Sequence, residues 1–447
     1  MARGPTLAGL AADLAAGRTS ARALVEACLE RIEEPAGQGA VAFTLVDREG
    51  ARAVADAMDR LRAAGAAPSP FAGIPISIKD LFEVQGQPTR AGSRVLGDRL
   101  GARDAPAVAR LRQAGFVVIG RTNMTEFAFS GLGLNPHYGT PLAPWNRAEG
   151  RIAGGSTSGG AVSVADGMAH GALGTDTGGS CRIPAAWCGL VGFKPTQRRV
   201  PRAGAVPLST TLDSIGPIAR SVACCAALDA LLSGEERAVA PVPLRRLRLL
   251  APTNGVLDGM EEAVERAFAA ALARLRAAGA AIDEVPLAPL DSLPAINAKG
   301  GFAAAEAYAW HRALLAEAGD RYDPRVRVRV ERGAGQSAVD YIELLAARTR
   351  LIAEVEAAFA GYDALVMPTT PILPPRLADL AEDEAYGRVN LLALRNPTTV
   401  NMFDGCAISV PTHAPEEPPV GLMLAGAAGS DARLLGIAQV VEELLSA

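Results

Sequence analysis

Lysine is almost missing from this chain. Of 44 basic residues in a sequence of 447, only Lys79, Lys194 and Lys299 are lysines, and the other 41 are arginines. Arginine does not lose its proton in a protein, whereas a desolvated lysine can. A lysine kept among so many arginines therefore marks a candidate position for a titratable amine. The alternative is chance survival, which we expect to explain at least one of the three.

Histidine and cysteine are scarce as well, and neither forms a metal-binding pattern. None of the four histidines lies within one helical turn of another, and the six cysteines contain no CxxC pair. The histidines are His137, His170, His311 and His413, and the cysteines are Cys28, Cys181, Cys188, Cys224, Cys225 and Cys406. We therefore expect reduced, mostly buried thiols, and neither a metal nor a cofactor.

Long apolar runs and an excess of positive charge are also absent. Gly, Pro or a charge interrupts the best apolar stretches within about ten residues, which is too short for a membrane-spanning helix. The N-terminus has no signal-peptide core with a cleavage site. The net charge of −4 argues against nucleic acid and anionic membranes as partners. With 49% hydrophobic and 21% charged residues the composition is that of a globular protein, and we expect a cytoplasmic location.

The order of helical and strand-like patterns predicts an α/β fold with a mixed sheet wrapped by helices. We expect helices over 21–34, capped by Thr19-Ser20, and over 48–65, 104–114, 260–278, within 300–360 and over 430–445. We expect strands in the run that ends at Lys79 and over 116–120, 247–252, 364–371, 406–412 and 420–426. A Gly-, Ser- and Thr-rich segment, 150–216, is too apolar for a linker and is placed in the centre of the sheet. A shift to Glu, Arg and Pro near 235–245 is the best candidate for a sub-domain boundary.

Two stretches in that segment, AGGSTSGG (153–160) and GTDTGGSCRIP (174–184), set glycines beside serines. Without Cβ atoms, backbone N–H groups can converge on one anion. Neither stretch has the Lys of a phosphate-binding P-loop or the GxGxxG of a dinucleotide site, so an oxyanion site remains. A serine nucleophile also needs a base. The GxSxG elbow is missing, histidine is scarce although His170 stays open, and Lys79 is the remaining candidate, neutralised by burial.

Four segments carry a resemblance to the amidase signature family. They are GIPISIKD (73–80), GRTNMTEFA (120–128), GGSTSGGAVSVADG and GALGTDTGGSCRIPAAWCGLVGFKPT (both within 154–196). The resemblance runs from about residue 5 to the C-terminus and is densest over 73–216. It implies one amidase domain over 1–447, with a large mixed twisted sheet surrounded by helices. The catalytic core would cover about 70–220, and a more variable helical, substrate-binding region about 235–400.

The resemblance also assigns roles to individual residues. Lys79 would be the base, Ser156 the bridging serine behind a cis peptide bond, and Ser180 the nucleophile. The backbone N–H groups of Thr177, Gly178, Gly179 and Ser180 would form the oxyanion hole, and Ala128 would offer its carbonyl to the substrate. In the implied mechanism Lys79 takes a proton from Ser156, Ser156 takes one from Ser180, and Ser180 attacks the amide carbonyl. Water then hydrolyses the acyl-enzyme.

Several neighbouring residues receive structural interpretations. We expect Asp176 and Arg182 to form an ion pair or to bind the loop backbone, and Ser158 to hydrogen-bond within the Gly/Ser loop. Cys181 replaces the usual Ile or Val after the nucleophile, and small-residue packing is the simplest explanation. Arg327, Arg329 and Arg332 form a basic patch that we interpret as a solvated face, with contact to an anionic substrate as the alternative.

The leading functional hypothesis is a free-standing hydrolase of small-molecule amides, and a homodimer is the expected assembly. One alternative is the glutaminase subunit of a tRNA-dependent amidotransferase, although the LGTY-like motif expected of that subunit is absent from 320–350. Another is a non-catalytic binding protein on the same fold. The presence of Lys79, Ser156 and Ser180 argues against the second alternative.

Overall fold

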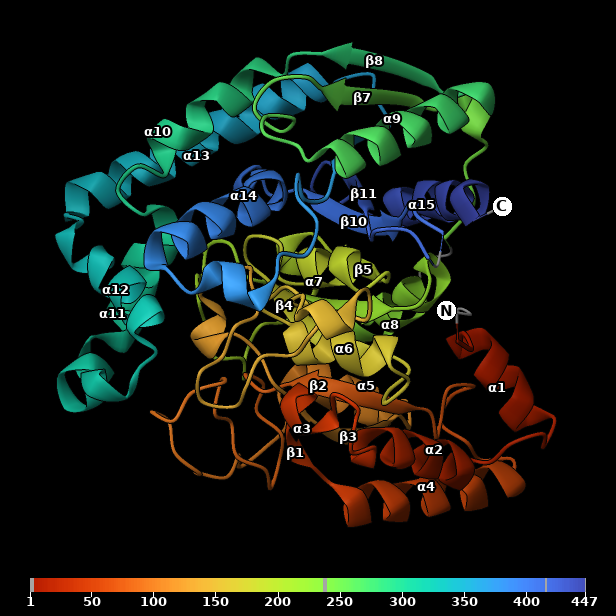
Figure 1. The fold of residues 1–447 in the computed structure, drawn as a ribbon. Coiled ribbons are helices and arrows are strands. Elements are labelled where there is room, and N and C mark those ends of the chain that lie inside the picture. Colours follow the sequence, from red (N-terminus) through yellow and green to blue (C-terminus); the bar gives the residue numbers. More distant parts are fainter. Residues whose placement is uncertain (1–3, 236–238, 415, 447) are drawn as a thin grey trace.

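A single mixed sheet organises the molecule in the computed structural model, which describes residues 4–235, 239–414 and 416–446 (Figure 1). The strands follow the order β1-β3-β2-β4-β6-β5-β10-β11-β9-β7-β8. Their bounds are β1 Phe43–Val46, β2 Pro75–Lys79, β3 Val117–Thr122, β4 Ala172–Asp176, β5 Val191–Lys194, β6 Ser214–Ala219, β7 Arg248–Pro252, β8 Ala281–Val285, β9 Ala364–Pro368, β10 Cys406–Pro411 and β11 Gly421–Gly426. β2 runs parallel to β3 and β4, whereas β6 is antiparallel to β4 and β5. The predicted mixed α/β sheet is confirmed.

Helices cover both faces of this sheet, and a further group of helices lies to one side of it. They are α1 Leu7–Ala15, α2 Ala21–Glu33, α3 Gly39–Ala42, α4 Arg48–Ala63, α5 Pro106–Gln113, α6 Ser158–Ala165, α7 Arg182–Trp187, α8 Val222–Ser233, α9 Glu262–Ala277, α10 Leu293–Ile296, α11 Gly301–Ala318, α12 Pro324–Glu331, α13 Ala338–Phe359, α14 Asp383–Met402 and α15 Asp431–Ser446. In β5, Gly192 faces α7, where an added Cβ would lie 2.7 Å from the Cβ of Ala185. The next strand residue, Phe193, joins the core on the α8 side with Leu228. This alternation buries both faces of the strand.

The elements with clear sequence periodicity form where they were expected. α2 begins after Ser20, whose hydroxyl accepts the Ala23 N–H at 3.0 Å, and it buries Leu24, Cys28 and Ile32 on one face. The expected strands correspond to β2, β3, β7, β9, β10 and β11, and the expected helices to α2, α4, α5, α9, α11 to α13 and α15. The sequence predicted these elements because the spacing of their apolar residues can be read from neighbouring positions in the chain, and this spacing sets which face is buried.

Elements with weak local signals were missed, among them β1, β8, α6, α7 and α14. α6 has the sequence SGGAVSVA, and glycine disfavours a helix. Tertiary contact explains its glycines, because a Cβ on Gly159 would lie 2.7 Å from the carbonyl oxygen of Asn123. α14 contains Pro397 within its span, which sequence rules place outside helix interiors. Packing of the whole molecule, rather than propensity, keeps these segments helical.

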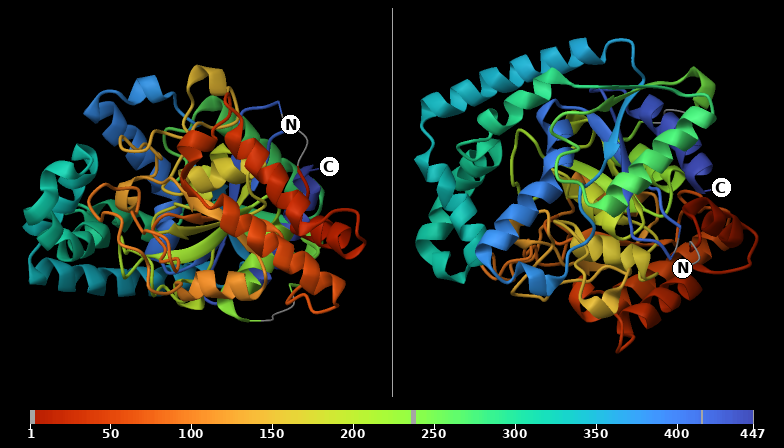
Figure 2. Two further views of the ribbon diagram at one scale, coloured as in Figure 1. Left: turned by 90° about the horizontal axis from the view of Figure 1, so that it is seen from below. Right: turned by 45° about the horizontal axis from the view of Figure 1, so that its top comes forward.

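The compositional shift at 235–245 separates two stretches of chain that share the same sheet. Residues 236–238 of that shift lie outside the described residues. Beyond it, β7, β8 and β9 extend the sheet at one edge, next to β11. The helices α11, α12 and α13 lie to one side of the sheet in all three views (Figures 1 and 2). Among the described helices, none combines the length and apolar character needed to cross a bilayer.

Candidate active site

Lys79, the last residue of β2, reaches two hydroxyl groups deep in the protein. Its side chain has no exposed surface. The ammonium nitrogen lies 2.7 Å from Ser156 Oγ and 2.8 Å from Thr175 Oγ1. The Gly155–Ser156 peptide bond is cis, as the family resemblance implied. A buried amine thus contacts a serine hydroxyl at hydrogen-bond distance.

Burial weakens the hold of Lys79 on its proton. Loss of hydration lowers the pKa of Lys79 to about 8 from an ordinary value of 10.5, and the negative charges of Asp176 and Asp213 oppose the shift. Within the described part of the chain, no carboxylate forms an ion pair with Lys79. The amine can therefore be neutral in mildly alkaline solution.

Backbone hydrogen bonds tie the two serine loops to each other and to the segment around Thr125. The Thr157 N–H donates to the Ser180 carbonyl at 3.3 Å, and the Thr125 N–H donates to the Ser156 carbonyl at 3.2 Å. Ser180 itself is 3% exposed and stands two residues before α7. The fold therefore brings Lys79, Ser156 and Ser180 into one buried region, although the last two are 24 residues apart in the sequence.

An ion pair organises the loop that carries Ser180. Arg182 Nη2 lies 2.7 Å from Asp176 Oδ1, and neither side chain is exposed. The same carboxylate accepts the Gly179 N–H at 2.8 Å and the Cys181 N–H at 3.1 Å. Burial alone would raise the pKa of Asp176, but Arg182 and its hydrogen bonds hold that pKa well below its usual range. Both expected functions, ion pairing and binding of the loop backbone, are present.

This arrangement corrects the predicted oxyanion hole. Because the Gly179 N–H donates to Asp176, it is not free to donate to a substrate oxygen. The N–H groups of Thr177, Gly178 and Ser180 find no acceptor among the residues that the structure describes. The glycine is still required at this place, because its φ is +122° and an added Cβ would lie 2.6 Å from Pro397 Cβ. Three free donors therefore remain of the four expected.

The interpretation of Ser158 was wrong. Its Oγ is fully buried and has no hydrogen-bond partner among the residues that the structure describes. Ser158 is the first residue of α6, and a Cβ atom added to Gly133 would lie 2.9 Å from the Cβ atom of Ser158. The side chain therefore faces the 131–135 segment rather than the Gly/Ser loop, and it packs there as a small side chain.

Ala128 stands in the neighbouring loop with an unusual backbone. It is buried and has φ +60°, and its N–H donates to the Thr125 carbonyl at 2.9 Å. Within 4–235, 239–414 and 416–446, no group donates to its own carbonyl. That oxygen is thus available for the substrate contact that the resemblance implied.

Two polar neighbours were not predicted from the sequence. Thr175 Oγ1 accepts a hydrogen bond from Lys79 Nζ, and the only sequence signal of Thr175 was a hydroxyl beside Asp176. Asp213 accepts the Thr177 hydroxyl at 2.6 Å and the Ser209 N–H at 3.0 Å. Burial raises the pKa of Asp213 to about 6. No local pattern could have found Asp213, because only the pairing of β4 with β6 brings it to Thr177.

His170, the open alternative base, lies elsewhere. Its N–H donates to the carbonyl of Pro75 at 3.0 Å, at the opposite end of β2 from Lys79. Its ring contacts the Cys28 thiol at 3.8 Å, and burial lowers its pKa to about 4. His170 therefore packs as a neutral residue away from Ser180.

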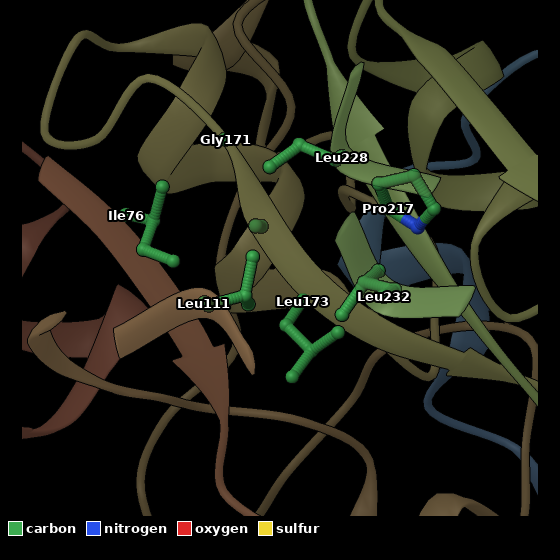
Figure 3. A pocket seen from close by; sticks show the side chains of 8 residues that line it. Ile76, Leu111, Gly171, Leu173, Pro217, Leu228 and Leu232 are labelled. Carbon is green, nitrogen blue, oxygen red and sulfur yellow. The ribbon is translucent and has the colours of Figure 1, made fainter. Parts of the chain in front are cut away.

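An apolar cavity lies on the other face of β2 (Figure 3). Its lining consists of Ile76, Leu111, Gly171, Ala172, Leu173, Pro217, Leu228 and Leu232. Side chains alternate along a strand, so Ile76 faces away from Lys79. With no polar side chain to orient a ligand, this cavity is a packing defect and not a substrate site.

The chain matches a protein-family model and is similar in sequence and structure to several known proteins. Residues 23–435 match the family model named Amidase. The 2-amino-5-chloromuconic acid deaminase of Comamonas testosteroni is 39% identical over 98% of this chain and 96% of its own length. A glutamyl-tRNA(Gln) amidotransferase subunit of Anaeromyxobacter sp. (strain K) is 35% identical over 97% of this chain and 95% of its own length. A crystal structure described as an amidase is 34% identical and covers 98% of this chain and 99% of its own, with a TM-score of 0.89.

Proposed function

Since the chain belongs to the amidase family and is an amide-hydrolysing enzyme, we propose that it cleaves its substrate through an acyl-enzyme on Ser180, with Lys79 as base and Ser156 as proton relay. The observation that carries this proposal is the 2.7 Å contact between Lys79 Nζ and Ser156 Oγ. A buried amine with a pKa of about 8 is largely neutral in mildly alkaline solution, where it can accept a proton, and a serine hydroxyl can pass one on.

The proposed first step forms one bond and moves two protons. Ser180 Oγ attacks the amide carbon while its proton passes to Ser156 Oγ, and the Ser156 proton passes to neutral Lys79. The carbonyl oxygen becomes an oxyanion. Return of the protons from Lys79 through Ser156 to the leaving nitrogen breaks the C–N bond and leaves an ester on Ser180. A water molecule then attacks this ester by the same relay, and the acid leaves.

The oxyanion would be held by the free backbone N–H groups of Thr177, Gly178 and Ser180. Donors fixed before the reaction stabilise developing charge without reorganising, and removing one such donor typically costs roughly 10²–10³-fold in kcat. Asp176 supports this function indirectly, because it fixes the loop through Gly179, Cys181 and Arg182.

The substrate class we propose is a small-molecule amide, with ammonia or an amine as the second product. The deaminase relative is named for a small organic acid, which fits a compact substrate. We infer a cytoplasmic enzyme, and a homodimer stays a prediction. The second candidate function is glutamine amide hydrolysis within an amidotransferase complex, favoured by the 35% identity to a component of such a complex over 97% of the chain. Co-purification with a second subunit from the native host would support it.

The decisive experiment combines activity with labelling. Purified protein is assayed on a panel of primary amides and incubated with a fluorophosphonate, which esterifies an activated serine. We expect turnover and a single labelled residue, Ser180. The variant Ser180→Ala should lose both, and Ser156→Ala should lose nearly all activity. Labelling of another serine, or turnover by Ser180→Ala, would contradict the proposal.

A further inference from the structure

The arginines of α12 and of the turn after it, expected to form a basic patch on a solvated face, do not form one surface. Arg327 Nε lies 2.7 Å from Glu331, so this charge is paired. Arg332 donates to a backbone carbonyl at 2.6 Å. Arg329 turns inward, to the Tyr386 hydroxyl at 3.3 Å. The interpretation as a solvated face therefore holds for Arg327 but not for Arg329, and the patch does not present its charges together to an anionic partner.

The next helix, α13, presents an apolar face to solvent. Val339, Ile342 and Leu345 are 63%, 64% and 42% exposed. A single exposed apolar side chain is ordinary, but three within two turns of one helix form a patch. Leu344 and Leu351 lie on the opposite side of the helix and are buried. α13 runs along the outer edge of the molecule in both views of Figure 2, so this apolar face is open to a partner.

The exposed residues of α13 repeat with the spacing of a coiled-coil seam. They recur at alternating steps of three and four residues, which is the pattern of the a and d positions of a heptad. These positions are Val339, Ile342, Ala346, Thr349 and Ala353, all of them exposed, and the charged Glu356 ends the series. The two alanines in this seam allow a second helix to approach closely. The pattern therefore indicates a helix of another molecule packed along α13.

The seam can pair with a second copy of itself. Two copies related by a twofold axis across α13 would run antiparallel, and each contact would occur twice. One register sets Ile342 against the partner's Ala353 and Ala346 against the partner's Thr349. In this register a large side chain meets a small one at both ends of the central layers, which is how helix surfaces interdigitate.

The flanks of the seam match in the same register. Glu343 and Arg350 are exposed, and within 4–235, 239–414 and 416–446 neither forms an ion pair or a hydrogen bond. The register brings Glu343 beside the partner's Arg350, and the twofold axis repeats this pair. On the other flank Leu345 comes beside the partner's Ile352, a residue that is only partly buried in its own chain. The face is thus complementary to itself in both charge and apolar character.

We propose that a second copy of this chain binds the exposed face of α13 through the same face, as an antiparallel helix pair with twofold symmetry. The axis closes the assembly at two copies, because each copy uses its only such seam among the described helices for the other. One helix pair buries less surface than a permanent interface, so we expect a reversible dimer. This inference concerns assembly and does not depend on the chemistry at Ser180.

The first test is the mass of the full chain in solution. Sedimentation equilibrium over a range of protein concentrations should show monomers and dimers in exchange. Ile342→Asp places a charge in the seam and should raise the dissociation constant of the dimer at least about tenfold. Leu391→Asp is the matched control, because Leu391 is 71% exposed on α14, outside the seam, and it should leave the constant unchanged. Circular dichroism should show that both variants are folded.

Charge reversal tests the antiparallel register. Glu343→Arg alone sets two pairs of like charge against each other, and Arg350→Glu alone does the same with the opposite sign. Each variant should self-associate at least about tenfold more weakly than wild type. An equimolar mixture of the two variants should form dimers again, because both flanking pairs then join opposite charges.

Three outcomes would overturn the inference. The first is a wild-type protein that stays monomeric at every concentration, and the second is a dimer that Ile342→Asp and both charge reversals leave unchanged. The third is a mixture of the two charge variants that stays monomeric, which would reject the antiparallel register. If the wild type is monomeric and instead binds a different host protein through Ile342, the face belongs to that protein and the second copy is refuted.

Discussion

Two lysines of this protein are buried to a similar extent and have similarly lowered pKa values, but they form hydrogen bonds with different groups. Lys79 and Lys194 are each almost completely buried, and burial lowers the pKa of each to about 8. Lys79 contacts the hydroxyls of Ser156 and Thr175. Lys194 instead donates to the carbonyls of Pro195 at 3.0 Å and of Gly405 at 2.5 Å.

The difference shows that burial and a lowered pKa do not by themselves mark a base. A carbonyl oxygen has no proton to give, so the neutral amine of Lys194 has nothing to deprotonate. A serine hydroxyl can lose its proton to a neutral amine and regain it later. The chemistry of the neighbours separates the two lysines, and Lys194 serves to tie the end of β5 to the turn before β10.

The largest effect should follow from removing the base. In Lys79→Met we expect kcat/KM to fall by roughly 10²–10⁴-fold, the usual contribution of general acid–base catalysis. Thermal unfolding and circular dichroism should show that the variant is folded. A variant with more than a tenth of the wild-type activity would contradict the assignment of Lys79.

Lys194→Met should disturb stability rather than chemistry. Two buried carbonyls would lose a charged donor, which we expect to cost about 1–3 kcal/mol in the free energy of unfolding. The folded variant should keep kcat within about threefold of wild type. Denaturant unfolding and steady-state kinetics on the same preparation separate the two readouts, and a large loss of kcat with unchanged stability would refute the comparison.

The pH dependence of activity should follow Lys79. Only the neutral amine is a base, so kcat/KM should rise with pH and level off above an apparent pKa of about 8. The negative charge of Asp213 raises the pKa of Lys79, so Asp213→Asn should move the rising limb to lower pH by less than about one unit. Lys194→Met is the matched control and should leave the limb in place. A shift to higher pH in Asp213→Asn would contradict this interpretation.

The smallest effect should come from the third lysine. Lys299 is exposed and pairs with Asp340, an interaction that arginine can also make. An exposed ion pair contributes about 0–1 kcal/mol. Lys299→Arg should therefore change neither kcat nor the unfolding midpoint beyond error, which identifies Lys299 as the lysine that chance survival explains.

Much of the fold was predictable because its signals are local. The apolar runs of β2, β10 and β11 and the capped amphipathic helix after Ser20 can each be read from neighbouring residues. α6 and α14 were not predictable, because Gly159 and Pro397 are unfavourable in isolated helices. They become helical where the rest of the molecule packs against them.

For the candidate site, composition and motif spacing were enough to identify which kinds of chemical group the site contains. They singled out three lysines, two Gly/Ser stretches and the serines at 156 and 180, because these are properties of residue type and order. Only the tertiary structure decided which lysine meets a hydroxyl, that Asp176 takes the Gly179 N–H, and that Asp213 accepts the Thr177 hydroxyl. Hydrogen bonds act over about 3 Å, and residues far apart in the chain come within that distance only after the sheet has formed.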